Sequence, residues 1–362
     1  MYLNQLTCST TDKFSIKKIP QRIGINNSFL VAIAKTAMIP PMVKLPVSPI
    51  NTCAGNVLYH KKPTKAPAKA AIYTVISPEF GINANLNIYL DLALHDLMGV
   101  ILNKPVYELI GVNGSKTTPI YSGMIYFDEL EHNGKTGGID KILENCNWDI
   151  EYGYRQLKIK IGRSGKWYSH EEGLKMDIEV IKKINIAFPD VTILVDSNDK
   201  YTLQDTINFL KGIGDIPLLW VEEPFRENYE EGKILRKWMN ENGFKNTLYA
   251  DGEANINHDL CMKMGKEDIM NVYLADIRSF GFTRWRQLMG ELKSYKMLAS
   301  PHAFGSMLKT HYITHIAAAF GNVVTIEGVS CFSDDIDFGN YKIFDGKIKV
   351  SDASGFGMKI LK

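Results

Sequence analysis

The chain has 362 residues, a formal net charge of +2, 45% hydrophobic residues and 23% charged residues, a composition typical of a globular protein. Its lysines and arginines are spread along the chain, which argues against the basic surface of a nucleic-acid-binding protein. The most apolar early segment, residues 28–38, contains Lys35 and is shorter than the roughly 18 residues of a membrane-spanning helix. We therefore expect no nucleic acid and no membrane as partners, and a small molecule as substrate.

The cysteines predict a reducing environment. There are five, they lie far apart, and no two form a CxxC pair. An odd number at such spacing is typical of free thiols and not of a disulfide framework or a cysteine metal site. The first twenty residues contain no apolar segment of the kind found in secretory signals. The sequence therefore predicts a cytoplasmic protein.

Residues 1–114 differ in composition from the remainder. They are rich in proline and asparagine, include the low-complexity segment "KKPTKAPAKAA" at 61–71, and end in a strongly helical segment at 86–111. No regular alternation of strands and helices is visible before residue 115. We predict that residues 1–114 form a separate α+β capping domain.

From residue 115 onward short β-branched or aromatic segments alternate with segments of helical periodicity. Eight such segments are predicted as strands: 119–127, 155–162, 192–198, 217–223, 246–253, 271–277, 296–302 and 323–328. Repeated βαβ units give a parallel sheet, and eight of them close into a barrel. The predicted fold class is α/β, with a (β/α)7–8 TIM-type barrel over residues 115–335.

The C-terminal segment, residues 336–362, is predicted to leave the barrel. Residues 341–360 are typical of two short strands joined by an Asp-Gly turn. We expect this segment to return to the N-terminal α+β capping domain and complete it.

Polar side chains follow almost every predicted strand, where the active sites of such barrels lie. A single acid in this position is most simply a helix N-cap or a surface carboxylate. Seven consecutive strands that end in ionisable groups favour one shared site instead. These residues are Lys158 and Lys160, Asp196 and Asn198, Glu222, Asp251 and Glu253, Asp276, His302, and Glu327.

Three carboxylates from successive strands, Asp196, Glu222 and Glu253, are expected to converge on one side of the barrel mouth. Oxygen ligands in such a group are typical of a Mg²⁺ site. A divalent cation would also relieve the repulsion between Glu222 and its neighbour Glu223. Asp251 is an alternative third ligand if the strand register differs.

Lys158 and Lys160 are two residues apart on a predicted strand, so both side chains should point into the barrel. The alternative, two lysines at a solvated edge, fits poorly with the flanking Leu157 and Ile159, which should face the helices. An ammonium close to a second ammonium and to a metal is easier to deprotonate. A lysine is therefore a candidate general base.

His302 and Asp276 end adjacent strands and are expected to pair. Such a pair would orient the imidazole and supply a second acid or base across the site from the lysines. The alternative is a structural histidine in the loop that "SPH" begins.

The ordered motifs "LKIKIG", "VDSN", "WVEEP", "DGE", "SPH" and "TIEG" resemble those of the enolase superfamily, and within it the mandelate racemase subgroup with its acid-sugar dehydratases. The resemblance implies Mg²⁺ held by Asp196, Glu222 and Glu253. It implies that Lys160 is one base and that the Asp276–His302 pair is the other. Further roles that it implies are Lys158 beside Lys160, substrate contacts by Asn198 and Lys158, and a hydrogen bond that Glu327 donates to a substrate carboxylate.

In that family the common step is removal of the proton α to a carboxylate. We expect a hydro-lyase that dehydrates an aldonate or aldarate to a 2-keto-3-deoxy acid, as in carbohydrate catabolism. The alternative enzyme is a racemase or epimerase of a 2-hydroxy acid, and a third possibility is a non-catalytic metal-binding barrel. The resemblance also implies a homo-oligomer, either a dimer or an octamer.

Overall fold

A computed structural model describes residues 84–130, 137–165, 168–253, 256–330 and 333–361 of the chain. The predicted capping domain therefore lies mostly outside the described residues, as do the low-complexity segment at 61–71 and the segment at 28–38. No helix in the described ranges is long and apolar enough to cross a membrane. The domain boundaries at residues 114 and 335 stay predictions.

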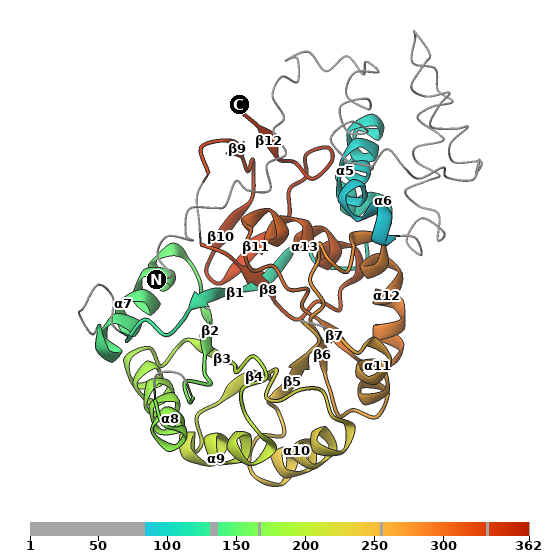
Figure 1. Ribbon diagram of the computed structural model, residues 1–362. Helices are drawn as coiled ribbons and strands as arrows, with labels where there is room; N and C mark the ends of the chain where they lie inside the picture. Colours follow the sequence, from blue (N-terminus) through green and yellow to red (C-terminus); the bar gives the residue numbers. More distant parts are fainter. Residues whose placement is uncertain (1–83, 131–136, 166–167, 254–255, 331–332, 362) are drawn as a thin grey trace, which may run out of the picture.

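Parallel strands alternate with helices to form the barrel, as predicted. In Figure 1 the strands lie at the centre and helices α7 to α13 surround them. The strands are β1 (Thr117–Ile125), β2 (Gln156–Lys160), β3 (Thr192–Asp196), β4 (Leu218–Glu222), β5 (Leu248–Asp251), β6 (Val272–Tyr273), β7 (Leu298–Ala299) and β8 (Ile326–Gly328). The helices are α7 (Gly138–Tyr152), α8 (His170–Ala187), α9 (Leu203–Ile213), α10 (Tyr229–Glu241), α11 (His258–Lys266), α12 (Phe282–Ser294) and α13 (Met307–Phe320).

Strands β1 to β7 pair in chain order, and β8 pairs with β1, so the sheet closes on itself. Closure between β7 and the segment before β8 uses two backbone hydrogen bonds. Ala299 N donates to Asn322 O at 2.9 Å, and Val324 N donates to Ala299 O at 3.0 Å. The eight predicted strands are therefore confirmed as one closed barrel.

Alternate residues of each strand face opposite sides of the sheet. Leu157, Ile159 and Ile161 pack toward the helices, as predicted, whereas Lys158 lies inside the barrel. A separate apolar cluster fills the interior beneath the site, and its buried members are Tyr121, Leu194, Trp220, Ala250, Val272 and Leu274. This packed floor leaves the carboxyl ends of the strands as the place where polar side chains gather.

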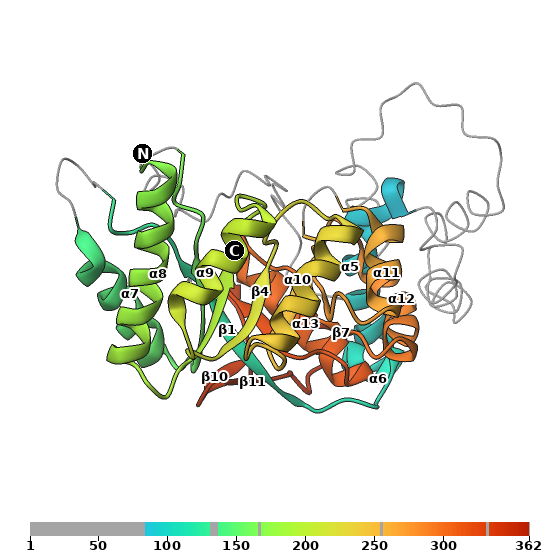
Figure 2. The same ribbon diagram turned by 90° about the horizontal axis from the view of Figure 1, so that it is seen from below.

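The helical segment predicted at 86–111 forms two helices, α5 (Ala84–Leu102) and α6 (Val106–Ile110). Helix α5 lies beside α12 in both views of the ribbon (Figures 1 and 2). Helix α12 begins after Gly281, which has no side chain to cap it. Asp91 of α5 supplies the cap, because its carboxylate accepts hydrogen bonds from Thr283 N at 2.8 Å and Thr283 Oγ1 at 2.6 Å.

The C-terminal segment contains the predicted hairpin. Strands β10 (Lys342–Phe344) and β11 (Lys347–Lys349) flank Asp345 and Gly346, which both have positive φ, as a type I′ turn requires. Strand β11 pairs antiparallel with the first part of β1. The remaining strands, β9 (Ile336–Asp337) and β12 (Lys359–Ile360), pair with each other.

After the hairpin the chain returns to α5 and α6. Gly355 N donates to Lys104 O at 3.0 Å, Val106 N donates to Gly355 O at 2.9 Å, and Phe356 N donates to Asp96 Oδ1 at 2.7 Å. The C-terminal segment therefore contacts the last two helices of residues 1–114.

Two histidines of α13 are buried and structural. His311 packs against the rings of Phe338 and Tyr341. His315 Nδ1 accepts a hydrogen bond from Tyr107 N at 3.1 Å, and its Nε2 lies 2.6 Å from the Tyr341 hydroxyl. The Tyr341 hydroxyl donates its own hydrogen to Phe356 O, so toward His315 it can only accept. His315 is therefore neutral, with its hydrogen on Nε2. Burial lowers the pKa of His311 to about 4 and that of His315 to about 3.

We expect the free-energy cost of His315→Asn, measured by urea unfolding, to shrink by about 2 kcal/mol between pH 7 and pH 4.5. In this range the unfolded wild type binds a proton at His315 and the folded protein does not, so acid destabilises the wild type through a contribution that the variant lacks. His311 contributes in the same direction in both proteins and cancels in the difference. Glu223, whose pKa burial raises to about 7, titrates with the opposite sign in both proteins and cancels in the difference. Ile313→Val, on the same helix, is the control and should cost the same at both pH values; a pH-independent cost for His315→Asn would contradict the assignment.

Candidate active site

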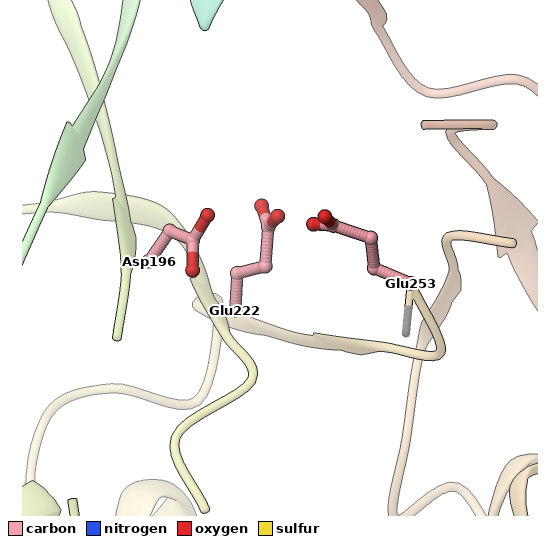
Figure 3. A group of neighbouring side chains, drawn as sticks. All are labelled: Asp196, Glu222 and Glu253. Carbon is pink, nitrogen blue, oxygen red and sulfur yellow. The ribbon is translucent and has the colours of Figure 1, made fainter. Parts of the chain in front are cut away.

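Three carboxylates meet at the carboxyl ends of β3, β4 and β5. Asp196 and Glu222 are the last residues of their strands, and Glu253 follows β5 by two residues. One oxygen from each lies within 4.8 Å of the other two. In Figure 3 the Glu222 carboxylate lies between those of Asp196 and Glu253. The predicted convergence of these three side chains is found in the structure.

The carboxylate cluster fits a divalent cation. Burial and the charge of Asp196 raise the pKa of Glu222 well above its usual range, which is the effect of like charges held together out of water. Glu253 Oε2 is buried and has no hydrogen-bond partner among the described residues. A hard cation with oxygen ligands would both compensate the charge and occupy the free oxygen.

Asp251 and Glu253 point to different sides because the chain turns at Gly252 between them. Ala250 faces the barrel interior, so Asp251 points outward between the strands and the helices. Its carboxylate accepts hydrogen bonds from the Tyr249 hydroxyl at 3.0 Å and from Gly252 N at 2.7 Å. Glu253 is therefore the residue of this pair that joins the carboxylate cluster.

The two predicted lysines both reach the carboxylate cluster. Lys158 Nζ lies 2.7 Å from Glu222 Oε1, 3.3 Å from Asp196 Oδ2 and 3.4 Å from Glu327 Oε1. Lys160 Nζ donates to Asp196 Oδ2 and to Asn198 Oδ1, the latter at 2.8 Å. The side chain of Lys158 is 2% exposed and that of Lys160 is 12% exposed. Of the two, Lys160 is the one that a substrate could reach.

The carboxylates around Lys158 act against the deprotonation that the sequence suggested for these lysines. The sequence suggested that a neighbouring ammonium would favour deprotonation. Burial does lower the pKa of Lys158, but the charges of Glu222 and Glu327 outweigh it and raise the pKa well above its usual range. Among these side chains the Lys158 ammonium neutralises buried carboxylates, and a role as base beside a metal stays a prediction.

Glu223 points away from Glu222 and has partners of its own. Its carboxylate accepts hydrogen bonds from Glu253 N at 3.2 Å and from Asn198 Nδ2 at 3.4 Å. Asn198 Oδ1 in turn accepts a hydrogen bond from Lys160. Glu223 therefore holds Asn198 and Glu253, two residues at the edge of the site. Its backbone has a φ of +40°, a conformation in which glycine is more usual. The turn separates the two adjacent carboxylates.

His302 and Asp276 pair as predicted. His302 Nδ1 lies 3.3 Å from Asp276 Oδ2, and Nε2 lies 3.1 Å from Glu253 Oε1, at the end of the carboxylate cluster opposite Lys160. Burial would lower the pKa of His302, but the charge of Glu327 and the hydrogen bond to Asp276 raise it overall. With Nδ1 facing Asp276, Nε2 faces the carboxylate cluster and can act there as an acid or as a base.

Glu327 is held as an acceptor. Its Oε2 accepts hydrogen bonds from Ala303 N at 2.5 Å and Phe304 N at 2.9 Å. Burial opposes ionisation, but Lys158 and His302 lower the pKa of Glu327 below its usual range. The role that the resemblance implies, donation to a substrate carboxylate, needs a protonated group and stays a prediction.

Two residues near the site were not predicted. Lys309 of α13 ion-pairs with Asp276 at 2.6 Å, and Arg163 binds Asp177 and Glu129 at 2.6 Å each. Arg163 also donates to Lys160 O at 2.9 Å, which fixes the end of β2. Arg163 could have been suspected from its position three residues after Lys160. The position of Lys309 in an ordinary helix gave no such signal.

The family model described as Enolase C-terminal domain-like matches residues 141–362. Two solved structures of galacturonate dehydratase from Geobacillus sp. are each 30% identical to this chain with a TM-score of 0.70, and cover 75% of it. The matches span 71% and 72% of those chains. One structure, of a mutant, is complexed with Mg, and the other with D-galacturonate and 5-keto-4-deoxy-D-galacturonate.

Curated relatives include more than one activity. Arabinonate dehydratase from Saccharolobus solfataricus is 26% identical over 140 residues, which is 38% of this chain; the match spans 34% of that relative, about a third of its length. Hydrophobic dipeptide epimerase from Enterococcus faecalis is 26% identical over 192 residues, or 51% of this chain and 46% of that relative. The relatives therefore include both dehydratases and an epimerase.

Proposed function

Because this chain belongs to the Enolase C-terminal domain-like family, we propose that it is a Mg²⁺-dependent dehydratase of a sugar acid. The reaction removes the proton α to the carboxylate and eliminates the β-hydroxyl, which gives a 2-keto-3-deoxy acid. The observation that carries this proposal is the placement of Lys160 and His302 at opposite ends of the cluster formed by Asp196, Glu222 and Glu253. A substrate over that cluster would have a proton-transfer group on each side.

Asp196, Glu222 and Glu253 would hold the Mg²⁺, which supplies Lewis-acid stabilisation of the charge that develops on the substrate carboxylate. Lys160 takes the α-proton, for which it must be neutral when substrate binds. Lys158 stays charged beside Glu222 and Glu327 and adds a fixed positive charge where negative charge develops.

His302 completes the elimination. After Lys160 has taken the α-proton, His302 Nε2 donates a proton to the β-hydroxyl, the C–O bond breaks and water leaves. The resulting enol becomes the 2-keto product by gaining a proton at the β-carbon and losing the proton of its 2-hydroxyl. Asp276 faces His302 Nδ1 and holds the ring so that Nε2 faces the site.

The relatives indicate which substrate classes should be tested first. Dehydratases of galacturonate and arabinonate are among them, so uronic, aldonic and aldaric acids are the first candidates. An epimerase is the second candidate function, favoured by the similarity to hydrophobic dipeptide epimerase and by the same two-sided geometry. A cytoplasmic homo-oligomer, dimer or octamer, is proposed on the resemblance alone.

The experiment is a screen of the purified protein with Mg²⁺ against uronic, aldonic and aldaric acids, scored by mass spectrometry for loss of water and repeated with EDTA. We expect a Mg²⁺-dependent loss of water from at least one acid. Incorporation of deuterium at the α-carbon without loss of water would replace the dehydratase by the epimerase. Absence of both reactions, with Mg²⁺ binding shown by calorimetry, would identify a non-catalytic barrel.

A further inference from the structure

Lys309 is a buried lysine that shares a carboxylate with His302. It lies in the first turn of α13 and its side chain is 10% exposed. Its Nζ donates to Asp276 Oδ2 at 2.6 Å and to Phe304 O at 2.9 Å. His302 Nδ1 faces that same Oδ2 at 3.3 Å. The ammonium and the imidazole thus meet at one oxygen atom.

The other oxygen of Asp276 is also occupied. Oδ1 accepts hydrogen bonds from Arg278 N at 3.0 Å, Ser279 N at 2.8 Å and Ser279 Oγ at 3.1 Å. With both oxygens held, the carboxylate cannot rotate to follow the imidazole. The position of Oδ2, and with it the direction of the His302 ring, is set by this turn and by Lys309 together.

The second contact of Lys309 fixes the loop that follows His302. Phe304 O accepts from Lys309, while Ala303 N and Phe304 N donate to Glu327. Lys309 therefore links Asp276, which follows β6, to Phe304, which follows β7. The backbone of residues 303 and 304 extends this link to Glu327 of β8. Loss of one partner from such a buried network leaves the others without compensation.

We propose that Lys309 is a positioning residue that holds Asp276 and the 303–304 loop so that His302 Nε2 faces the carboxylate cluster. This inference rests on the proposed function, in which His302 acts as the general acid. Among the described residues, the Lys160 ammonium contacts Asp196, Asn198 and the Tyr126 ring, and Lys309 touches none of these three. The two halves of the reaction should therefore respond differently to a change at position 309.

The test compares Lys309→Met with the wild type in D₂O on the acid that the screen identifies. We expect loss of water to slow by about 10- to 100-fold, because His302 no longer delivers its proton. Exchange of the α-proton for solvent deuterium, which needs only Lys160, should stay within about threefold of the wild type. Lys293→Met, an exposed lysine on α12, is the matched control and should change neither rate.

Two outcomes would overturn the proposal: an equal fall of exchange and dehydration, which would indicate general damage, or no change in either. If Lys309→Met does not fold, Lys309→Gln replaces it, since its amide can still donate to Phe304 O. Calorimetry should show that Mg²⁺ still binds, because Lys309 contacts none of the three carboxylates directly and reaches Glu253 only through His302.

A measurement independent of turnover separates this proposal from the proposed function. The ¹⁵N resonances of the His302 ring, assigned with His302→Asn, should move in Lys309→Met and stay in place in Lys293→Met. Unmoved resonances would refute the positioning role even if the enzyme is a dehydratase. Moved resonances in a protein that dehydrates no acid would keep the positioning role and refute the dehydratase.

Discussion

Replacement of Lys160 by alanine is expected to reduce turnover by about 10²- to 10⁴-fold, the usual contribution of a general base, and to leave Mg²⁺ bound. Lys160 reaches the carboxylate cluster at the Asp196 end, and its side chain is the more accessible of the two lysines. Because its ammonium contacts Asp196 Oδ2, Lys160 would compete with the cation for that oxygen. The variant should therefore bind Mg²⁺ at least as tightly as the wild type.

Steady-state kinetics and calorimetry with Mg²⁺ check the two parts of this prediction. Lys182→Ala, an exposed position on α8, is the control and should retain full activity. In D₂O the Lys160→Ala variant should also lose α-proton exchange, in contrast to Lys309→Met. Turnover within about threefold of the wild type would remove Lys160 from the base role, and weaker Mg²⁺ binding would show that Lys160 supports the metal ligands.

The barrel was predictable because strands and helices leave different periodicities in the sequence. Helix α9 (Leu203–Ile213) is preceded by a Thr202–Asp205 capping box, a start signal that is visible in the sequence. Strands β6 and β7 were predicted as longer segments, but each is only two residues long. The polar residues after them, Asp276 and His302, lie beyond the ends of these strands and pair with each other in an isolated β-bridge.

The candidate site was predictable as a set, because the carboxyl ends of parallel strands meet at one face. The third carboxylate was not, since "YADGE" allows either Asp251 or Glu253 to face inward. The chain turns at Gly252, where φ is +105°, and this turn returns Glu253 to the inner side. A backbone turn of this kind decides orientation without leaving a periodic signal.

The charge states of the site residues could not be derived from their spacing along the strands. Two lysines two residues apart suggested a weakened ammonium, but the structure surrounds Lys158 with Glu222, Asp196 and Glu327. Glu327 comes from β8, on the opposite side of β2 from β3 in the sheet order. The contact of Lys309 with Asp276 likewise joins residues 33 positions apart. Such long-range pairs determine which group is charged, and a single sequence does not show them.

Replacement of Lys158 by methionine is the substitution that we expect to affect stability most. Methionine fills a similar volume but leaves Asp196, Glu222 and Glu327 buried without their shared cation. Loss of one partner from a buried ion pair costs about 3–5 kcal/mol, because the remaining charge stays out of water. We expect the free energy of unfolding of the metal-free protein to fall by this amount.

Mg²⁺ should recover much of that loss. The cation binds the folded chain at Asp196, Glu222 and Glu253 and so stabilises it by mass action; in the variant it also replaces the missing positive charge beside Asp196 and Glu222. Urea unfolding of the wild type and of Lys158→Met, each with EDTA and with saturating Mg²⁺, gives the four free energies needed. Lys182→Met is the control and should cost little in either condition.

The difference between the EDTA and Mg²⁺ conditions tests whether Lys158 and Mg²⁺ compensate the same carboxylates. If Lys158 serves as the counter-ion for groups that also bind the metal, Mg²⁺ must stabilise the variant more than the wild type. Equal stabilisation would mean that the two cations act on separate charges, and the metal site would have to lie elsewhere. A cost below about 1 kcal/mol in EDTA would mean that the carboxylates take up protons when Lys158 is absent, which the raised pKa of Glu222 allows. In that case the cost should grow as the pH rises, because those protons are then lost while the charge stays buried.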